Sequence, residues 1–193
     1  MKNKLLSLVF HKNLLQKKSK KIFYYGIFDE KLKKKIKNLN YIIELNDKYC
    51  PKETIRDLSY CEKIYYRILK ELSKRFNKFH NCSFSQKEWQ IIFGNWLFQF
   101  ICIVFKKYKS ILVLINKKQF KKIYINFSNQ FTPSPDIFHL HSVINQREWN
   151  EKLTSKVMKF LAEKKKINLI NLNKESKKIN YDNLISDKFL TSS

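Results

Sequence analysis

The sequence predicts an α/β fold, and three observations support this prediction. Short runs of β-branched and aromatic residues alternate along the chain with long segments in which apolar residues recur every three or four positions. Of the 193 residues, 44% are hydrophobic and 15% are aromatic, which is enough for a sizeable core. Only 2 glycines and 3 prolines are present, so collagen-like and flexible-linker proteins are excluded.

Four short runs predict strands. Each is rich in Ile, Phe, Tyr or Leu and is bounded by polar or turn-forming residues, as strands of a buried sheet are. The first ends near a glycine followed by two acids, and the second is closed by Asn-Asp and a proline. The runs are residues 20–28, 40–45, 121–127 and 167–172.

Two long helices are predicted in the middle of the chain. In residues 53–79 the apolar positions follow a helical period with charged residues between them, so an amphipathic helix is expected there. Ser83 or Ser85 can cap a second helix, and Ser85 and Glu88 have the spacing of a capping box. The pair Gly94–Asn95 predicts a break in that second helix.

The pattern beyond residue 110 is less specific. Residues 111–115 fit either a continuation of the second helix or a separate strand. Asn145 and Glu148 again have capping-box spacing, and they predict a third helix that runs to about Lys164. A polar, proline-containing loop is expected before this helix.

The charge pattern predicts three parts of the chain. Residues 1–19 form a basic N-terminal segment, residues 20–172 the α/β domain and residues 173–193 a polar tail. The apolar run at residues 5–10 is too short for a signal peptide. The apolar stretch 89–105 contains polar interruptions and falls short of the ~20 residues that span a bilayer, so it predicts a buried core helix.

The net charge is +24, which makes polyanions candidate partners. Of the 40 basic residues 36 are lysines, and residues 106–122 hold seven lysines and no acid. Arginine is the residue that forks onto phosphate and stacks on bases, so its scarcity argues against nucleic acid as a partner. A solvated lysine-rich surface and contact with an anionic membrane surface both remain open.

Cysteine and glycine usage excludes several enzyme classes. The four cysteines contain no C-x-x-C pair, so we expect reduced thiols in a cytoplasmic protein and no zinc knuckle. Two glycines cannot supply a P-loop or a dinucleotide-binding glycine motif, and no nucleophile elbow is present. The sequence therefore predicts no bound cofactor.

A metal site could be assembled only from scattered residues. Asp136, His139 and His141 are close in sequence, and His80 and Cys82 could join them from elsewhere in the chain. However, an H-x-H pair on a helix or turn places its two imidazoles on different faces. We therefore predict no metal site.

Five short stretches carry a resemblance to a known family, and they occur in the family's order. They are KIFYYG, YRILKELSKRFNKFH, KEWQIIFGNWLFQF, Pro135–Asp136 and REWN. In this order they resemble the N-terminal region of transferases found in bacterial O-antigen and other surface-polysaccharide loci. The chain departs from the family pattern at three places. The family usually has proline at the position of Asn95 and an acidic residue at the position of Arg147. Its opening strand usually has the sequence F-L-G-x-W, where this chain has Tyr24, Tyr25 and Phe28.

The resemblance implies a Rossmann-like three-layer domain with a short, mostly parallel sheet and long amphipathic helices, similar to the N-terminal half of a two-domain glycosyltransferase. It also implies that the chain is a truncated domain on the acceptor side of a transferase. Whether such a domain is active alone is not decided by the resemblance. Its partner would be a nucleotide-sugar-binding domain or the product of an adjacent gene. The resemblance places the protein in the cytoplasm, peripheral to the inner face of the membrane.

The same resemblance implies the site residues, whereas catalytic residues are not assigned. Taken alone, a histidine at a helix end is more simply a partner of the helix dipole, and tryptophans at helical spacing are more simply core residues. The family pattern nevertheless assigns an acceptor pocket to Asn77, His80, Trp89, Asp136 and Asn150. It assigns structural roles to Gly26, Gly94, Trp96 and Trp149.

The sequence is also compatible with two other interpretations. The first is a non-enzymatic basic protein that binds nucleic acid or an anionic membrane surface, with an affinity that falls steeply with salt. The second is a degenerate fragment without activity, which would expose apolar surface where another domain should dock.

Overall fold

The chain forms two compact units. The first, called here the sheet unit, draws on residues 1–46, 112–131 and 145–193, and the second, the hairpin unit, on residues 47–111 and 132–144. The structure is a computed structural model. It describes residues 5–8, 22–25, 42–44, 51–117, 120, 122–125, 131–165, 167 and 169–171.

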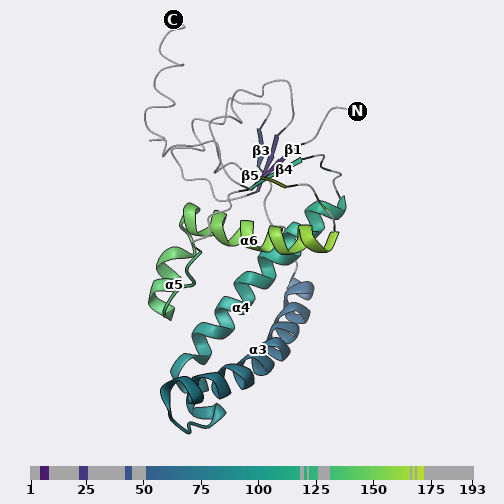
Figure 1. Cartoon of the computed structure of the whole chain (residues 1–193). Coiled ribbons are helices and arrows are strands. Elements are labelled where there is room, and N and C mark those ends of the chain that lie inside the picture. Colours follow the sequence, from purple (N-terminus) through teal and green to yellow (C-terminus); the bar gives the residue numbers. More distant parts are fainter. Residues whose placement is uncertain are drawn as a thin grey trace, which may run out of the picture. The chain divides into compact units, whose positions relative to one another are not determined.

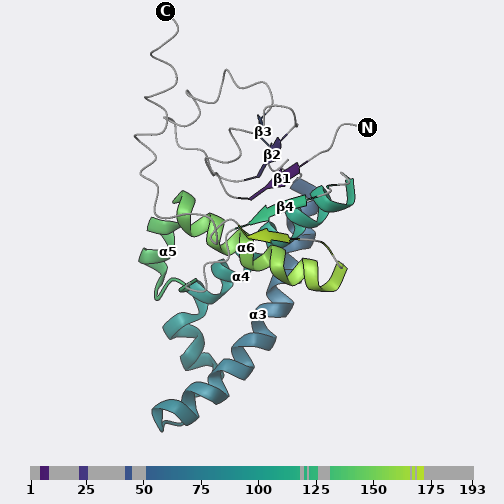
Figure 2. The ribbon, with the colours of Figure 1, turned by 45° about the horizontal axis from the view of Figure 1, so that its top comes forward.

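The sheet unit contains a five-stranded, fully parallel sheet (Figure 2). Its strands are β1 (Leu5–Ser7), β2 (Ile22–Tyr24), β3 (Ile42–Glu44), β4 (Lys122–Ile125) and β5 (Leu169–Asn171). Their order in space is β3-β2-β1-β4-β5, so the direction of winding reverses between β1 and β4. This is the strand order of a Rossmann-like sheet, and it confirms the predicted α/β class.

The central strand β1 was not predicted. It pairs with both β2 and β4, and Ser7 lies in register with Tyr24 on one side and Tyr124 on the other. The sheet therefore begins before residue 20, where the α/β domain was expected to start. Its residues belong to the apolar run 5–10, which was considered only as a signal peptide and not as a strand. The other four strands were predicted, and each is shorter than its apolar run.

Helix α6 (Arg147–Lys165) packs against the sheet at β4. Its second half buries apolar side chains, and the strands bury Leu6, Phe23 and Ile123. The predicted end near Lys164 is confirmed, while the helix starts two residues after the expected cap at Asn145. The buried apolar residues of α6 are Trp149, Leu153, Val157, Met158, Leu161 and Ala162.

The hairpin unit is built on two long helices, α3 (Pro51–His80) and α4 (Gln86–Lys117), which lie side by side (Figure 1). A short helix, α5 (Ile137–Val143), completes it. The stretch 89–105 is part of α4 and supplies core residues, as predicted. Among the described helices, none has the length and apolar composition needed to cross a bilayer. The core is Cys61, Tyr65, Leu69, Trp89, Leu97 and Ile101.

The break expected at Gly94–Asn95 is absent, because α4 runs without interruption from Gln86 to Lys117. A glycine inside a helix costs only about 1 kcal/mol relative to alanine. Trp89 and Leu97, on either side of Gly94, are both buried against α3, and this packing outweighs the local preference. Residues 111–115 are helical, which settles the alternative that the sequence left open.

Two expectations lie outside the described residues. They are the structural role of Gly26 and the polar tail 173–193.

Candidate functional site

The connection between α3 and α4 brings three of the predicted site residues together. Helix α3 ends at His80 because Asn81 adopts a left-handed backbone with φ of 50°. The Cys82 amide then donates to the Asn77 carbonyl at 3.0 Å, which closes the helix end. Asparagine tolerates this conformation better than most residues.

The Asn77 side chain ties this turn to α4. Its Oδ1 accepts from the Trp89 indole Nε1 at 2.7 Å and from the Cys82 thiol at 3.4 Å. Its Nδ2 donates to the Phe84 carbonyl at 2.7 Å. The amide therefore joins both helices and the connection between them, so Asn77 positions the turn.

Trp89 and His80 lie against each other, with ring centroids 6.0 Å apart. The Trp89 side chain is 7% exposed and packs against Phe76 at 5.3 Å and Phe84 at 5.4 Å. His80 is exposed. The histidine is thus the one member of the trio Asn77, His80 and Trp89 that faces solvent.

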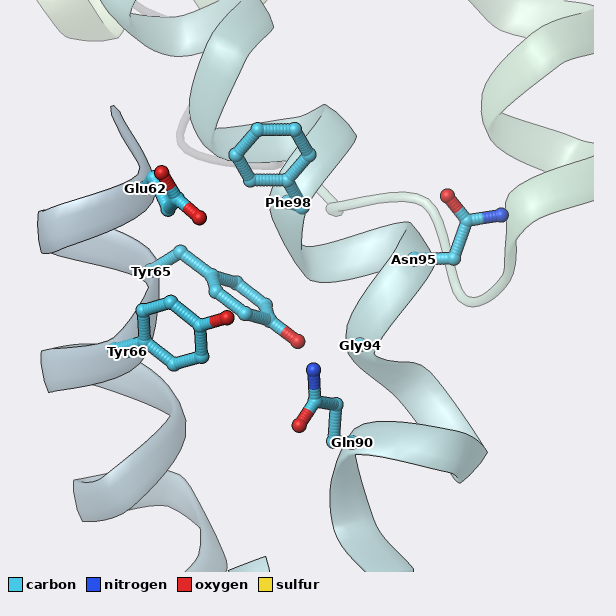
Figure 3. A pocket seen from close by; sticks show the side chains of 7 residues that line it. All are labelled: Glu62, Tyr65, Tyr66, Gln90, Gly94, Asn95 and Phe98. Carbon is cyan, nitrogen blue, oxygen red and sulfur yellow. The ribbon is translucent and has the colours of Figure 1, made fainter. Parts of the chain in front are cut away.

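A groove of about 300 Å³ opens farther along the same two helices (Figure 3). Helix α3 contributes a carboxylate and two phenols, and α4 contributes two amides, a glycine and an aromatic ring. Such a mixture of aromatic faces with polar groups suits a small polar ligand. The lining residues are Glu62, Tyr65, Tyr66, Gln90, Gly94, Asn95 and Phe98.

The glycine at position 94 makes room for Tyr65. A Cβ built at Gly94 would lie 2.5 Å from the Tyr65 hydroxyl, closer than such atoms approach in proteins. In Figure 3 the Tyr65 ring reaches from α3 toward Gly94 and the Gln90 amide. Gly94 is therefore a site of close approach between helices, and not the helix break that the sequence suggested.

The phenol of Tyr65 stays protonated at neutral pH. Burial raises its pKa and the adjacent Tyr66 adds to the effect, while a side-chain hydrogen bond with Gln90 acts in the opposite direction. A protonated phenol both donates and accepts hydrogen bonds. The groove thus holds neutral hydrogen-bonding groups beside one carboxylate, Glu62.

The thiols next to the groove are poor nucleophiles. Burial, followed by the neighbouring Cys102 and Asp57, raises the pKa of Cys61 to about 12. Burial also raises the pKa of Cys102. Cys61, Cys82 and Cys102 are free.

Helix α5 is linked to the groove through side chains. The His141 imidazole Nε2 lies 2.8 Å from Gln99 Oε1, and Gln99 Nε2 donates to Asn95 Oδ1 at 3.1 Å. His139 instead faces Ser134, with its Nδ1 3.0 Å from the hydroxyl. The two histidines therefore have different partners, as the H-x-H spacing predicted.

The predicted pocket residue Asp136 caps α5. Its side chain accepts from the His139 backbone amide at 2.8 Å, and its carbonyl accepts from the Ser134 hydroxyl at 2.8 Å. Asp136 is thus placed by this short helix rather than in the groove. In the part of the chain that the structure describes, no group of three histidine, cysteine or acidic side chains could hold a metal ion.

Asn150 and Trp149 belong to the other unit. In the first turns of α6, Asn150 Nδ2 donates to the Gln146 carbonyl at 2.9 Å, and the next residue, Glu151, accepts from the Tyr24 hydroxyl at 3.3 Å. Trp149 packs against Phe131 with ring centroids 5.7 Å apart. The polar start of α6 thus belongs to the sheet unit, whereas the residues of the α3–α4 turn belong to the hairpin unit.

Sequence reasoning found the turn but missed most of the groove. Gly94 was singled out, whereas its groove neighbours Tyr65, Tyr66 and Gln90 were not. Their grouping depends on the register between two helices, and no local spacing encodes that register. The only available signal was an isolated glycine within an apolar helix, which often marks a close approach.

Comparison with known proteins gives one match. Residues 5–192 match the model of a protein family described as LIC12162 family transferase. No curated protein and no solved structure matches the chain.

Proposed function

Because the chain belongs to the LIC12162 transferase family, we propose that it is the acceptor-side domain of a transferase in surface-polysaccharide or O-antigen synthesis. The groove between α3 and α4 binds a sugar of the acceptor. A nucleotide-sugar-binding domain, in the same protein or in a partner, supplies the donor. The observation that supports this proposal best is the composition of the groove.

The groove offers the groups that a sugar requires. A sugar ring presents hydroxyls that donate and accept hydrogen bonds, together with an apolar C–H face. Tyr66 is 47% exposed and presents both a ring and a hydroxyl, and Gln90 offers an amide from the facing helix. Glu62 adds a carboxylate that can accept from two hydroxyls. The described residues that line the groove include no cation for a phosphate, so a neutral or amino sugar fits better than a nucleotide.

The experiment is a binding assay on the full chain. An array of oligosaccharides from bacterial surface polysaccharides is screened first, and the best ligand is then titrated by calorimetry. Tyr66→Phe removes a groove hydroxyl and retains the ring, so affinity is expected to fall by about three- to tenfold, the effect of one hydrogen bond.

Tyr60→Phe is the matched control. Tyr60 is 52% exposed on the same helix but packs against Phe105, outside the groove. Its substitution is expected to leave affinity unchanged. Equal effects of the two variants, or no binding by any glycan on the array, would overturn the assignment of the groove.

A further inference from the structure

The end of the α3–α4 hairpin exposes an unusual set of large apolar side chains. Phe79 is 80% exposed, Ile91 79%, Ile92 59% and Phe84 43%. All four lie in the last turn of α3, the connection at residues 81–85 or the first two turns of α4. They are called here the tip patch.

Basic residues surround the tip patch. Between residues 74 and 92 the chain has four cationic side chains and one acid, Glu88. That acid is engaged locally, because its Oε2 accepts from the Ser85 backbone amide at 2.7 Å. The tip therefore presents positive charge together with apolar side chains. The cations are Lys74, which pairs with Glu71 at 3.6 Å, and Arg75, Lys78 and Lys87.

We propose that the tip patch docks the protein on an anionic lipid bilayer, with Phe79, Phe84, Ile91 and Ile92 entering the interfacial region and the lysines contacting lipid phosphates. Aromatic and branched side chains flanked by lysines are suited to the headgroup boundary. Each lysine near an anionic leaflet adds attraction that salt weakens.

The position of the tip patch favours a bilayer over a protein partner. The four residues lie at or beside the turn that joins α3 and α4, at the end of the helical hairpin (Figure 1). A bilayer interface accepts such an end without a matching concave surface, whereas a protein partner requires one.

The tip is held rigid by its own contacts, so docking requires no folding step. The Trp89 ring packs beneath Phe84, and the Asn77 amide bonds both helices. Side chains that enter the interface from a fixed turn lose little conformational freedom on binding.

Docking would also place the sugar groove close to the lipid. Gln90 of the groove precedes Ile91 of the tip patch in the chain, so the groove begins within two helical turns of the docked residues. The membrane proposal stands on the tip patch alone and does not require that the groove bind a sugar.

The experiment is co-sedimentation of the full chain with vesicles. Phosphatidylcholine vesicles are compared with vesicles that also contain phosphatidylglycerol, at low and at physiological salt. We expect binding to the anionic vesicles, weakened by salt. The double variant Phe79→Ser/Ile91→Ser should weaken that binding by about tenfold or more, because two exposed apolar anchors are lost.

Two matched controls separate the tip from the rest of the surface. Phe138→Ser removes an 85% exposed phenylalanine of α5 and should leave vesicle binding unchanged. Lys78→Ser/Lys87→Ser should weaken binding, whereas Lys156→Ser/Lys164→Ser on α6 should have a smaller effect. Thermal unfolding of each variant checks that it is folded, as expected for exposed positions.

Several results would overturn the proposal. One is equal vesicle binding by Phe79→Ser/Ile91→Ser and the wild type. Another is an equal loss of vesicle binding in the two lysine double variants. A third is equal binding to neutral and anionic vesicles. Self-association that Phe79→Ser/Ile91→Ser abolishes, without vesicle binding, would identify a second copy of the chain as the occupant. Salt-sensitive binding of duplex DNA through Lys78 and Lys87, without vesicle binding, would identify nucleic acid instead.

Discussion

The turn of the hairpin and the groove beside it lie on the same two helices but differ in how their polar groups are used. At the turn, the Asn77 amide bonds Trp89, Cys82 and Phe84, so polar groups hold the helices together. At the groove, Gly94 removes a side chain and leaves phenol, amide and carboxylate groups facing an open space. Polar residues between the two helices therefore hold the helices together at the turn, whereas at the groove they also face an open space that a ligand can enter.

The largest effect is expected at Asn77. Asn77→Ala removes the acceptor of the buried Trp89 Nε1 and the donor to the Phe84 carbonyl. Leaving such groups unsatisfied costs roughly 1–3 kcal/mol each, so the free energy of unfolding should fall by about 2–4 kcal/mol. Urea unfolding measures the loss.

Asn77→Asp keeps the acceptor for the Trp89 indole but turns a carboxylate oxygen toward the Phe84 carbonyl, so one acceptor faces another. It should therefore be destabilising as well, although Trp89 keeps its partner. If Asn77→Ala unfolds like the wild type, the amide does not hold the turn and our distinction between turn and groove is wrong.

The two tryptophans of α4 allow a second comparison, between a bonded and an unbonded indole N–H. The Trp89 Nε1 donates to Asn77, whereas the buried Trp96 Nε1 has no partner within the described part of the chain. Trp89→Phe removes a bonded donor and Trp96→Phe an unbonded one. Trp89→Phe should therefore lower the free energy of unfolding by about 1 kcal/mol more than Trp96→Phe.

The two rings also differ in burial. Repeating both substitutions in the Asn77→Ala background separates this contribution from that of the hydrogen bond. There the excess effect of Trp89→Phe should disappear, because its partner is gone. An excess that survives would mean that ring packing, not the hydrogen bond, distinguishes the two positions.

The turn could be predicted from sequence far better than the groove. Ser85 and Glu88 form the predicted capping box, with the Glu88 amide donating to Ser85 Oγ at 3.3 Å. His80 and Asn81 end the helix where the pattern placed its end. These features depend on neighbours within a few residues, and local spacing encodes such contacts directly.

The groove and the central strand depend on distant neighbours. Gly94 suggested a helix break because propensity is local, yet packing against α3 keeps α4 continuous. Tyr65 and Gln90 meet across two helices, at a register that no motif encodes. Strand β1 lies in the apolar run 5–10, and only its pairing with β2 and β4 identifies this run as a strand.

Gly94→Ala tests why the groove is open. The new methyl group would meet the Tyr65 hydroxyl at 2.5 Å, and the buried Tyr65 ring has little freedom to move away. The substitution should therefore destabilise the fold, although alanine is intrinsically better than glycine in a helix by about 1 kcal/mol. Thermal unfolding shows whether the substitution lowers or raises the melting temperature.

The same substitution in a Tyr65→Phe background should have the opposite effect. Without the hydroxyl the clash is relieved, and Gly94→Ala should stabilise the fold by up to about 1 kcal/mol. If alanine is tolerated equally in both backgrounds, Gly94 is not required for the approach of Tyr65.

The smallest effect is expected at the capping box of the turn. Hydrogen bonds from the Ser85 hydroxyl and backbone lower the pKa of Glu88 below its ordinary 4.5. A carboxyl whose pKa is lower in the folded state stabilises the fold above pH 4.5, and this stabilisation is lost as the pH falls through the folded value. Ser85→Ala should move the pKa of Glu88 back toward 4.5, as followed by an NMR titration of its side chain. Ser83→Ala, in the same connection, should leave the titration unchanged; a shift of equal size in both variants would show that the turn as a whole, and not the capping box, sets the charge of Glu88.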